Sequence, residues 1–370
     1  MSHPSFLEVK GSASRHCVVV FSSFALRDYG PGAFSFRHFF EPHSNSADLL
    51  FIKDWKNQWY NRSLRGLGDS YEEVASALRA RLEGYESVST FGSSMGGYAA
   101  LMFGDEIGAR RVIAASPQTF LKQPYPRYKP KIHSGEYIDL RQRCFATVTD
   151  IDIFIGEECL FDIYQCLPFM DMPNVHLHFV PDTFHVPVEH WGRVGILTRL
   201  ATSLCTQNAD GYIDKLSNSY ACSKVARGLR QPLLCSQITD AVEGYFLQQY
   251  GRAVDALRRI VDMEPDWLGP RALLGQSLLR SGDEAGASAE FKLVFQNNVC
   301  IDDFHADYAM LLARSGDAQA AIDVAKQAVR LNASNSSIFA TLESLFGEMG
   351  LAAGVAACKP YTSPPAPPAA

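Results

Sequence analysis

Short apolar runs separated by polar or helical stretches dominate the first half of the chain. They occupy residues 16–22, 48–52, 88–91, 111–116, 152–156 and 175–180. Continuous apolar runs of this length are typical of parallel strands that are buried on both faces. Because helical patterns or long connections lie between them, they predict an α/β fold with a doubly wound, mostly parallel sheet.

Two stretches of this half are expected to be helices. Residues 70–83 begin with Ser70, followed three residues later by Glu73, which is the arrangement of a capping box. Residues 188–205 carry the apolar positions of a helix that closes the domain. In sheets of this kind functional residues gather at the carboxyl ends of the strands. The candidate chemistry is therefore sought directly after each apolar run.

Beyond residue 235 the apolar pattern changes to a repeat with a period of 34 residues. The repeated positions are Gln248, Gly282, Gly316 and Gly350, and Ala253, Ala287 and Ala321. Small residues at such points let the two helices of one repeat approach closely, which predicts an all-α domain of helix–turn–helix repeats. The pattern resembles that of tetratricopeptide repeats (TPR-like), although the first repeat has Gln248 where the others have glycine.

These patterns divide the chain into four parts. We expect an α/β domain over residues 1–205, a linker over 206–235, the helical repeats over 236–356, and a proline-rich disordered tail over 357–370. The linker is polar and weakly patterned, and an irregular helical connection is the alternative for it.

Composition narrows the class of protein. The chain has 370 residues, a formal net charge of −6 and 47% hydrophobic residues, as expected of a soluble globular protein without a nucleic-acid or polybasic membrane partner. Its nine cysteines include no C-x-x-C pair, which indicates reduced thiols rather than a disulfide framework. Residues 1–10 lack the basic start and apolar core of a signal peptide, and no apolar stretch reaches the length of a membrane span, so we expect a cytoplasmic protein.

The strongest motif is Gly92-Ser93-Ser94-Met95-Gly96, a G-x-S-x-G sequence between an apolar run and a helix-forming stretch. This is the strand–turn–helix context of a nucleophile elbow, with Ser94 at its tip. Glycines are needed because side chains at Gly92, Gly96 and Gly97 would collide with the neighbouring strand or helix.

Serine attacks only when a neighbouring base takes its proton and a third group holds that base. Over residues 10–205 the chain resembles the α/β-hydrolase family, in which the order is serine, acid, histidine. The resemblance implies that His185, directly after the last predicted strand, is the base.

The acidic member of the triad departs from the position that the family usually gives it. Many members of the family carry it a few residues beyond a glycine such as Gly156, and that position here is Cys159. We take the nearest downstream aspartate, Asp162, as the acid, and keep Glu158 and then Glu157 as alternatives.

Other residues are expected to complete the pocket. The backbone N–H of Met95 would be one oxyanion donor, and Ser23 or Phe24 would supply the second. Gln118 either lies at the rim of the pocket or has a structural role in the turn after its strand. The aromatic loop with Trp59 and Tyr60, and also Trp55, serves either to stack on a sugar ring or to pack in the core.

No metal or cofactor is expected. A site built from His176, His178, His185 and His190 would lack the carboxylate or cysteine pattern that zinc sites show. Two of these, His176 and His178, lie within one strand, and we take them as packing or surface residues.

The leading hypothesis is a serine-dependent hydrolase of ester or thioester bonds that works through an acyl-enzyme. Transfer of the acyl group to a sugar or another alcohol is a close variant. The alternative is a non-catalytic interaction protein, in which the repeats bind a protein partner on a concave surface and the α/β domain is a scaffold.

Overall fold

The computed structural model describes residues 4–11, 14–24, 33–121, 137–145, 148, 150–185, 187–220, 223, 225, 228, 229, 231–299, 301, 304–331 and 336–362. Its contacts divide the chain into two compact units. The first contains Met1–Gly156, Phe161–Pro181 and Val186–Arg227, and the second contains Gly228–Ala370 with the short segments Glu157–Leu160 and Asp182–His185. None of the helices in the described ranges combines the length and the apolar character needed to cross a membrane.

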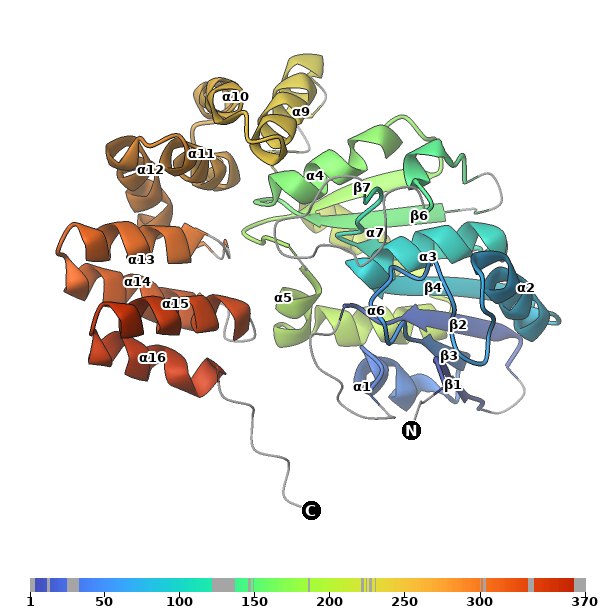
Figure 1. Ribbon diagram of the computed structural model, residues 1–370. Helices are drawn as coiled ribbons and strands as arrows, with labels where there is room; N and C mark the ends of the chain where they lie inside the picture. Colours follow the sequence, from blue (N-terminus) through green and yellow to red (C-terminus); the bar gives the residue numbers. More distant parts are fainter. Residues whose placement is uncertain are drawn as a thin grey trace. The chain divides into compact units, whose positions relative to one another are not determined.

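A twisted sheet forms the centre of the first unit (Figure 1). Its described strands are β1 (Phe6–Val9), β2 (His16–Phe21), β3 (Asp48–Ile52), β4 (Ser87–Ser93), β5 (Arg111–Ala115), β6 (Asp150–Gly156) and β7 (Val175–Val180), in the spatial order β1-β3-β2-β4-β5-β6-β7. Every neighbouring pair is parallel except β1 with β3. The predicted doubly wound, mostly parallel sheet is confirmed. The edge strand β1 was not predicted, because it is short and half exposed and lacks a continuous apolar run.

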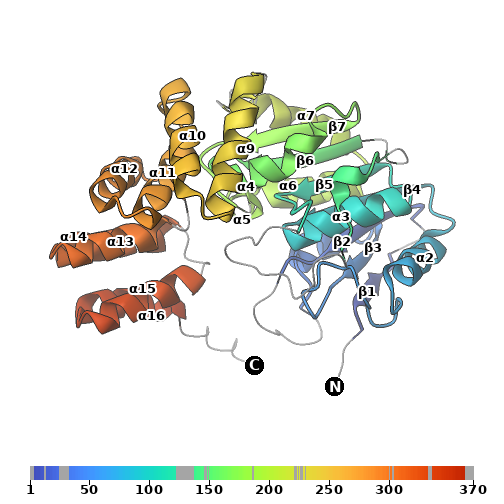
Figure 2. The ribbon, with the colours of Figure 1, turned by 45° about the horizontal axis from the view of Figure 1, so that its top comes forward.

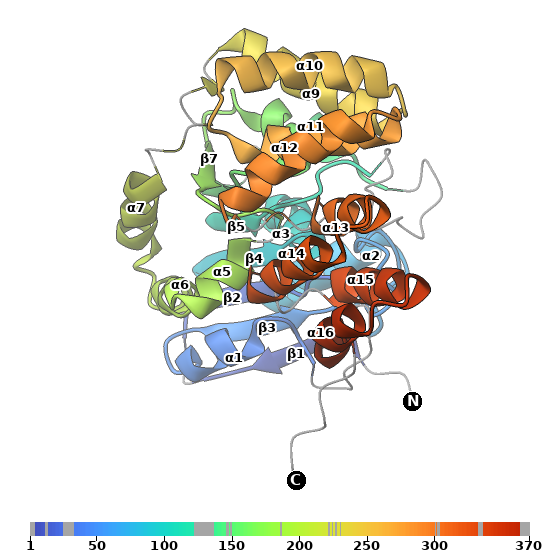
Figure 3. The same cartoon turned by 90° about the vertical axis from the view of Figure 1, so that its left-hand side faces the viewer.

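Helices cover both faces of this sheet (Figures 1 and 3). On one face lie α2 (Tyr71–Leu82), α3 (Met95–Glu106) and α4 (Leu160–Cys166), and on the other lie α1 (Arg37–Phe40), α5 (Pro187–Arg193), α6 (Ile196–Cys205) and α7 (Ala209–Tyr220). Short 3₁₀ turns occupy Glu41–His43, Leu140–Gln142 and Leu167–Phe169. Alternate side chains of the central strands, such as Val18 and Val20, pack against Trp191, Leu200 and Leu204 in one apolar core. Every residue of β2 and β3 is buried, so these strands are covered on both faces, as the continuous apolar runs predicted.

Two predicted boundaries differ from the structure. The expected closing helix is broken into α5 and α6 at Gly195, whose φ of 76° lies in the left-handed region that helices do not use. The stretch predicted as a linker contains α7, and Ile213 and Leu216 of that helix are buried in the core of the first unit. At least this part of the stretch is therefore a packed element.

The start of α2 follows half of the predicted capping box. The Ser70 hydroxyl accepts a hydrogen bond from the Glu73 backbone N–H at 3.2 Å. The Glu73 carboxylate, however, accepts from the N–H of Asp69 at 2.8 Å.

The second unit contains a series of helical hairpins (Figure 2). The described pairs are α9 (Pro232–Phe246) with α10 (Tyr250–Met263), α11 (Leu268–Arg280) with α12 (Glu284–Gln296), α13 (Phe304–Arg314) with α14 (Ala318–Leu331), and α15 (Ser336–Glu348) with α16 (Ala352–Thr362). The last helix continues beyond the predicted end of the repeats at residue 356, and residues 363–370 of the predicted tail lie outside the described residues.

The residues that repeat every 34 positions share one backbone conformation. Gln248, Gly282, Gly316 and Gly350 have φ values of 59°, 92°, 89° and 70°. Each ends the first helix of a hairpin in the left-handed conformation, for which glycine is the natural choice. The predicted helix–turn–helix units are thus present, while their membership of the tetratricopeptide family stays a prediction.

Candidate active site

Ser94 lies at the turn between β4 and α3, in a conformation that residues with a side chain rarely adopt. Its φ and ψ are 53° and −118°, and the residue is 5% exposed. Its N–H donates to the carbonyl oxygen of Ala115 on β5 at 2.8 Å, which fixes the turn against the neighbouring strand. Such strain costs about 1–3 kcal/mol and persists only where the surroundings enforce it.

The glycines around Ser94 make this turn possible. A Cβ atom on Gly92 would lie 2.1 Å from the carbonyl oxygen of Gly96, and one on Gly96 would lie 2.4 Å from that of Phe21 on β2. On Gly97 it would lie 3.0 Å from the carbonyl oxygen of Ala115. The collisions expected from the motif are therefore present at Gly92 and Gly96, and the third position is tight.

The ends of the neighbouring parallel strands bring the other candidates to the same edge of the sheet. β4, β5, β6 and β7 pair in parallel one after another, so their carboxyl ends lie together. Ser94 follows β4, Gln118 follows β5, Asp162 follows β6 and His185 follows β7. Residues that are far apart in the chain thus follow strand ends that lie at one edge of the sheet.

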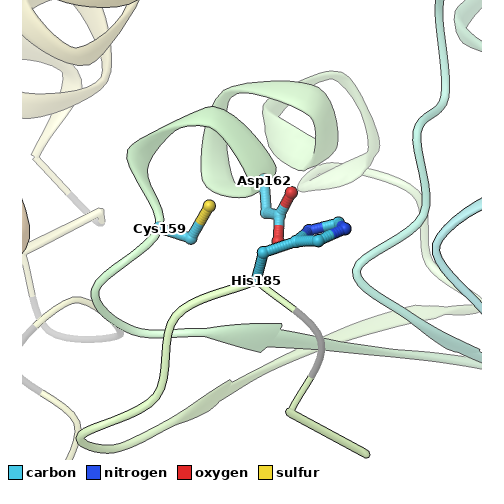
Figure 4. A group of neighbouring side chains, drawn as sticks. All are labelled: Cys159, Asp162 and His185. Carbon is cyan, nitrogen blue, oxygen red and sulfur yellow. The ribbon is translucent and has the colours of Figure 1, made fainter. Parts of the chain in front are cut away.

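Asp162 and His185 belong to a tight group of side chains together with Cys159 (Figure 4). One sulfur, carboxylate oxygen or imidazole nitrogen atom of each lies within 4.8 Å of the others. Asp162 and Cys159 are fully buried, and His185 is half buried. The acid that we chose by chain order is therefore close to the predicted base, and the cysteine that occupies the usual acid position lies beside both.

This group also contains the donor types that a zinc ion accepts, namely a thiolate, a carboxylate and an imidazole. It is the group in the described residues whose geometry could hold a metal ion, and it includes only one of the four histidines considered from the sequence. Burial and the negative charge of Asp162 raise the pKa of the nearby Cys166 well above its ordinary value, so this second thiol stays protonated.

The alternative acid Glu158 lies outside this group. Its carboxylate accepts a hydrogen bond from the backbone N–H of Gly269 in the first turn of α11. The carbonyl oxygen of Glu157 accepts from the indole N–H of Trp267 at 2.8 Å. These bonds stay within the second unit, and they give both glutamates structural partners that sequence patterns did not reveal.

The three residues considered as oxyanion donors, Met95, Ser23 and Phe24, lie in different surroundings. Met95 is the first residue of α3, where backbone N–H groups have no partner within the helix. The N–H of Ser23 donates to the Ser35 hydroxyl at 3.2 Å. Of the two residues expected to supply the second oxyanion donor, Ser23 therefore already uses its N–H within the fold. Phe24 follows it and places its ring 5.9 Å from that of Trp59.

The aromatic loop is mainly a structural element. Tyr60 is fully buried, and its hydroxyl donates toward the carbonyl oxygens of Ser22 and Ile52 at 2.8 and 3.2 Å. Tyr60 therefore has a structural role within the fold, whereas stacking on a sugar would require an exposed ring. Trp55 is half buried and carries the Lys53 ammonium 3.9 Å from its ring centre.

Trp59 connects this loop to the residues after β5. It is 1% exposed, and its indole N–H donates to the Gln118 side-chain oxygen at 2.7 Å. Gln118 is itself 1% exposed. Ser93, the last residue of β4, and Ser116, directly after β5, were not singled out from the sequence, although each stands at the end of an apolar run.

His178 has a separate structural role. One ring nitrogen lies 2.8 Å from a carboxylate oxygen of Asp152, and the other lies 3.1 Å from the hydroxyl of Ser217 on α7. Arg111 binds the same aspartate and also Asp210 of α7. This network attaches α7 to the sheet, while His176 is exposed, in keeping with packing and surface roles for the two histidines.

Several solved structures are similar to about half of this chain, at low sequence identity. No protein-family model matches the sequence, and no curated protein matches it. The capsule O-acetyltransferase of Neisseria meningitidis serogroup A is 18% identical, with a TM-score of 0.40, over 52% of this chain and 90% of that one. The monoacylglycerol lipase of Paleococcus ferrophilus is 14% identical, with a TM-score of 0.36, over 54% and 98% of the two chains. The fluorophosphonate-binding serine hydrolase F of Staphylococcus aureus is 12% identical, with a TM-score of 0.35, over 53% and 85%.

Proposed function

We propose that this protein is a serine-dependent hydrolase or acyltransferase that acts on ester or thioester bonds through an acyl-enzyme. The observation that carries the proposal is the strained conformation of Ser94, which close contacts enforce at the turn between β4 and α3. Strain of this kind is retained where a side chain must be presented for chemistry.

The proposed mechanism uses three side chains. The Ser94 hydroxyl attacks the carbonyl carbon of the ester while the imidazole of His185 takes its proton. Asp162 orients the imidazole and stabilises the positive charge that forms on it. The buried position of Asp162 beside His185 supports this role.

The charge that develops on the carbonyl oxygen needs donors already in place. We assign the first to the backbone N–H of Met95, where the start of α3 also favours negative charge. We assign the second to the N–H of Phe24, because that of Ser23 is bonded to Ser35. His185 then protonates the leaving alcohol or thiol, and water or an acceptor alcohol releases the acyl group in a second step.

The test is covalent labelling with a fluorophosphonate probe, together with turnover of p-nitrophenyl acetate. We expect Ser94→Ala to abolish labelling and to lower turnover by roughly 10³-fold or more. Ser89→Ala is the matched control, since it makes the same change at a buried position near the other end of β4 and should leave both signals unchanged. If the folded wild-type chain takes up no probe, the proposal is wrong and an interaction role for the helical repeats becomes the better hypothesis.

A further inference from the structure

Three buried polar atoms near Ser94 have no hydrogen-bond partner within the part of the chain that the structure describes. They are the hydroxyl oxygens of Ser93 and Ser116 and the side-chain nitrogen of Gln118. Each residue is at most 1% exposed. Buried polar groups are nearly always hydrogen-bonded, so three exceptions at or just after the ends of the paired strands β4 and β5 require an explanation.

The three side chains extend from the chain segments on either side of the nucleophile turn, namely the end of β4 and the residues after β5. Ser93 directly precedes Ser94 and pairs in register with Ala115 of β5. Ser116 follows Ala115 with a positive φ of 43°, so the backbone is also strained at this strand end. Gln118 follows two residues later, beyond Pro117, which lies against Gly97 of α3.

The orientation of the Gln118 amide is determined by Trp59. The indole nitrogen can only donate, so the atom that it contacts at 2.7 Å must be the amide oxygen. The amide nitrogen, with its two hydrogens, therefore points away from Trp59. Because both side chains are buried and bonded to each other, this donor is held in place before any ligand arrives.

The chemistry of the three groups indicates their ligand. An amide N–H donates, and a serine hydroxyl both donates and accepts, so together they match the oxygen atoms of neutral hydroxyl groups. None of the three carries a charge that would select a phosphate or a carboxylate. A purely apolar alcohol would leave all three without partners, which buried polar groups penalise.

We propose that Gln118, with Ser116 and Ser93, forms a subsite for a polyhydroxylated alcohol, such as a sugar, that forms part of the ester substrate. This inference rests on the proposed function, because it needs Ser94 to react with the ester that the subsite holds. Gln118 acts as a positioning residue for the alcohol, and Trp59 positions Gln118.

The test compares two acetate esters of primary alcohols of similar size, 6-O-acetylglucose and cyclohexylmethyl acetate. We expect the wild-type chain to prefer the sugar ester in kcat/KM. Gln118→Glu keeps an oxygen acceptor for Trp59 and removes the N–H donor, and Gln118→Met removes both. Each variant should lower kcat/KM for the sugar ester by roughly 3- to 10-fold, mainly through KM, and should leave cyclohexylmethyl acetate within about twofold.

Each outcome bears on the proposal. Equal losses on both esters would show that Gln118 only supports the fold of the site, and no loss on either would show that it contacts no substrate; both results overturn the subsite. If neither glutamine variant folds, Ser116→Ala carries the same comparison, with the same selective loss expected. Fluorophosphonate labelling of the wild type separates the two ideas: labelling without a sugar preference overturns the subsite alone, and absence of labelling overturns the proposed function and the subsite with it.

Discussion

Replacing Gly96 by alanine tests whether the close packing around Ser94 controls the reaction. A Cβ atom at this position would lie 2.4 Å from the carbonyl oxygen of Phe21 and 2.9 Å from that of Ser22. Both oxygens belong to the backbone at the end of β2, which is paired on both sides by β3 and β4. Since this backbone cannot rotate away as a side chain would, reaching even 3.0 Å requires a shift of about 0.6 Å at the start of α3.

A shift of that size is large for a catalytic site. Reacting groups must be held within about 0.5 Å of their productive positions, and a misplacement of about 1 Å can cost about 100-fold in rate. Gly96 adjoins Met95, the proposed oxyanion donor. We therefore expect Gly96→Ala to lower kcat/KM by roughly 10- to 100-fold. The overpacking should also lower the free energy of unfolding by about 1–3 kcal/mol.

Gly97→Ala is the matched control one residue later. Its Cβ would lie 3.0 Å from the carbonyl oxygen of Ala115 and 3.3 Å from two atoms of Pro117, contacts that adjustments of a few tenths of an ångström relieve. We expect its kcat/KM to stay within about threefold of wild type. The assay is the rate of fluorophosphonate labelling and the turnover of p-nitrophenyl acetate, measured below the unfolding transition of each variant. A folded Gly96→Ala protein with wild-type rates would refute the reasoning.

Three further perturbations test other parts of the molecule. Asp162→Asn should lower kcat by roughly 10²- to 10⁴-fold with the fold intact, whereas Cys159→Ser should change it by less than about threefold; the reverse order would make the cysteine the functional partner of His185. Gln248→Gly should stabilise the second unit by about 0.5–1 kcal/mol in urea unfolding, because glycine accepts the positive φ at this position without strain, and a loss of stability would contradict the role of this turn. Arg111→Met should destabilise the first unit by about 3–5 kcal/mol, since it leaves the buried Asp152 without its guanidinium partner; an unchanged melting temperature would show that the network contributes little.

Local sequence rules predicted the elements that depend on nearby residues. The strands at β2, β3 and β5, and the turn at Ser94, follow from short apolar runs and from the spacing of small residues. The hairpins of the second unit follow from a position that recurs every 34 residues, occupied by Gln248 and then by three glycines, and always in the left-handed conformation that glycine accepts without strain. Chain order left three candidate acids, with Asp162 preferred over Glu158 and Glu157, and the structure brings Asp162 close to His185.

Other features required the fold, because they join residues that no local pattern connects. The polar composition of residues 206–235 predicted a linker, yet apolar positions of α7 pack into the sheet core. The aromatic loop pattern does not reveal that the Tyr60 hydroxyl donates toward the carbonyl oxygens of Ser22 and Ile52. Nor does the sequence reveal that the N–H of Ser23 donates to the Ser35 hydroxyl.

The G-x-S-x-G spacing located the turn at Ser94, because a collision such as that of a Cβ on Gly92 with Gly96 depends on residues only a few positions apart. The tertiary structure alone decided which carboxylate lies beside His185 and which way the Gln118 amide points. Those outcomes depend on contacts across 23 positions of the chain between Asp162 and His185, and across 59 between Trp59 and Gln118. Hydrogen bonds and burial act over distances in space, and spacing along the chain does not report them until the sheet brings its strand ends together.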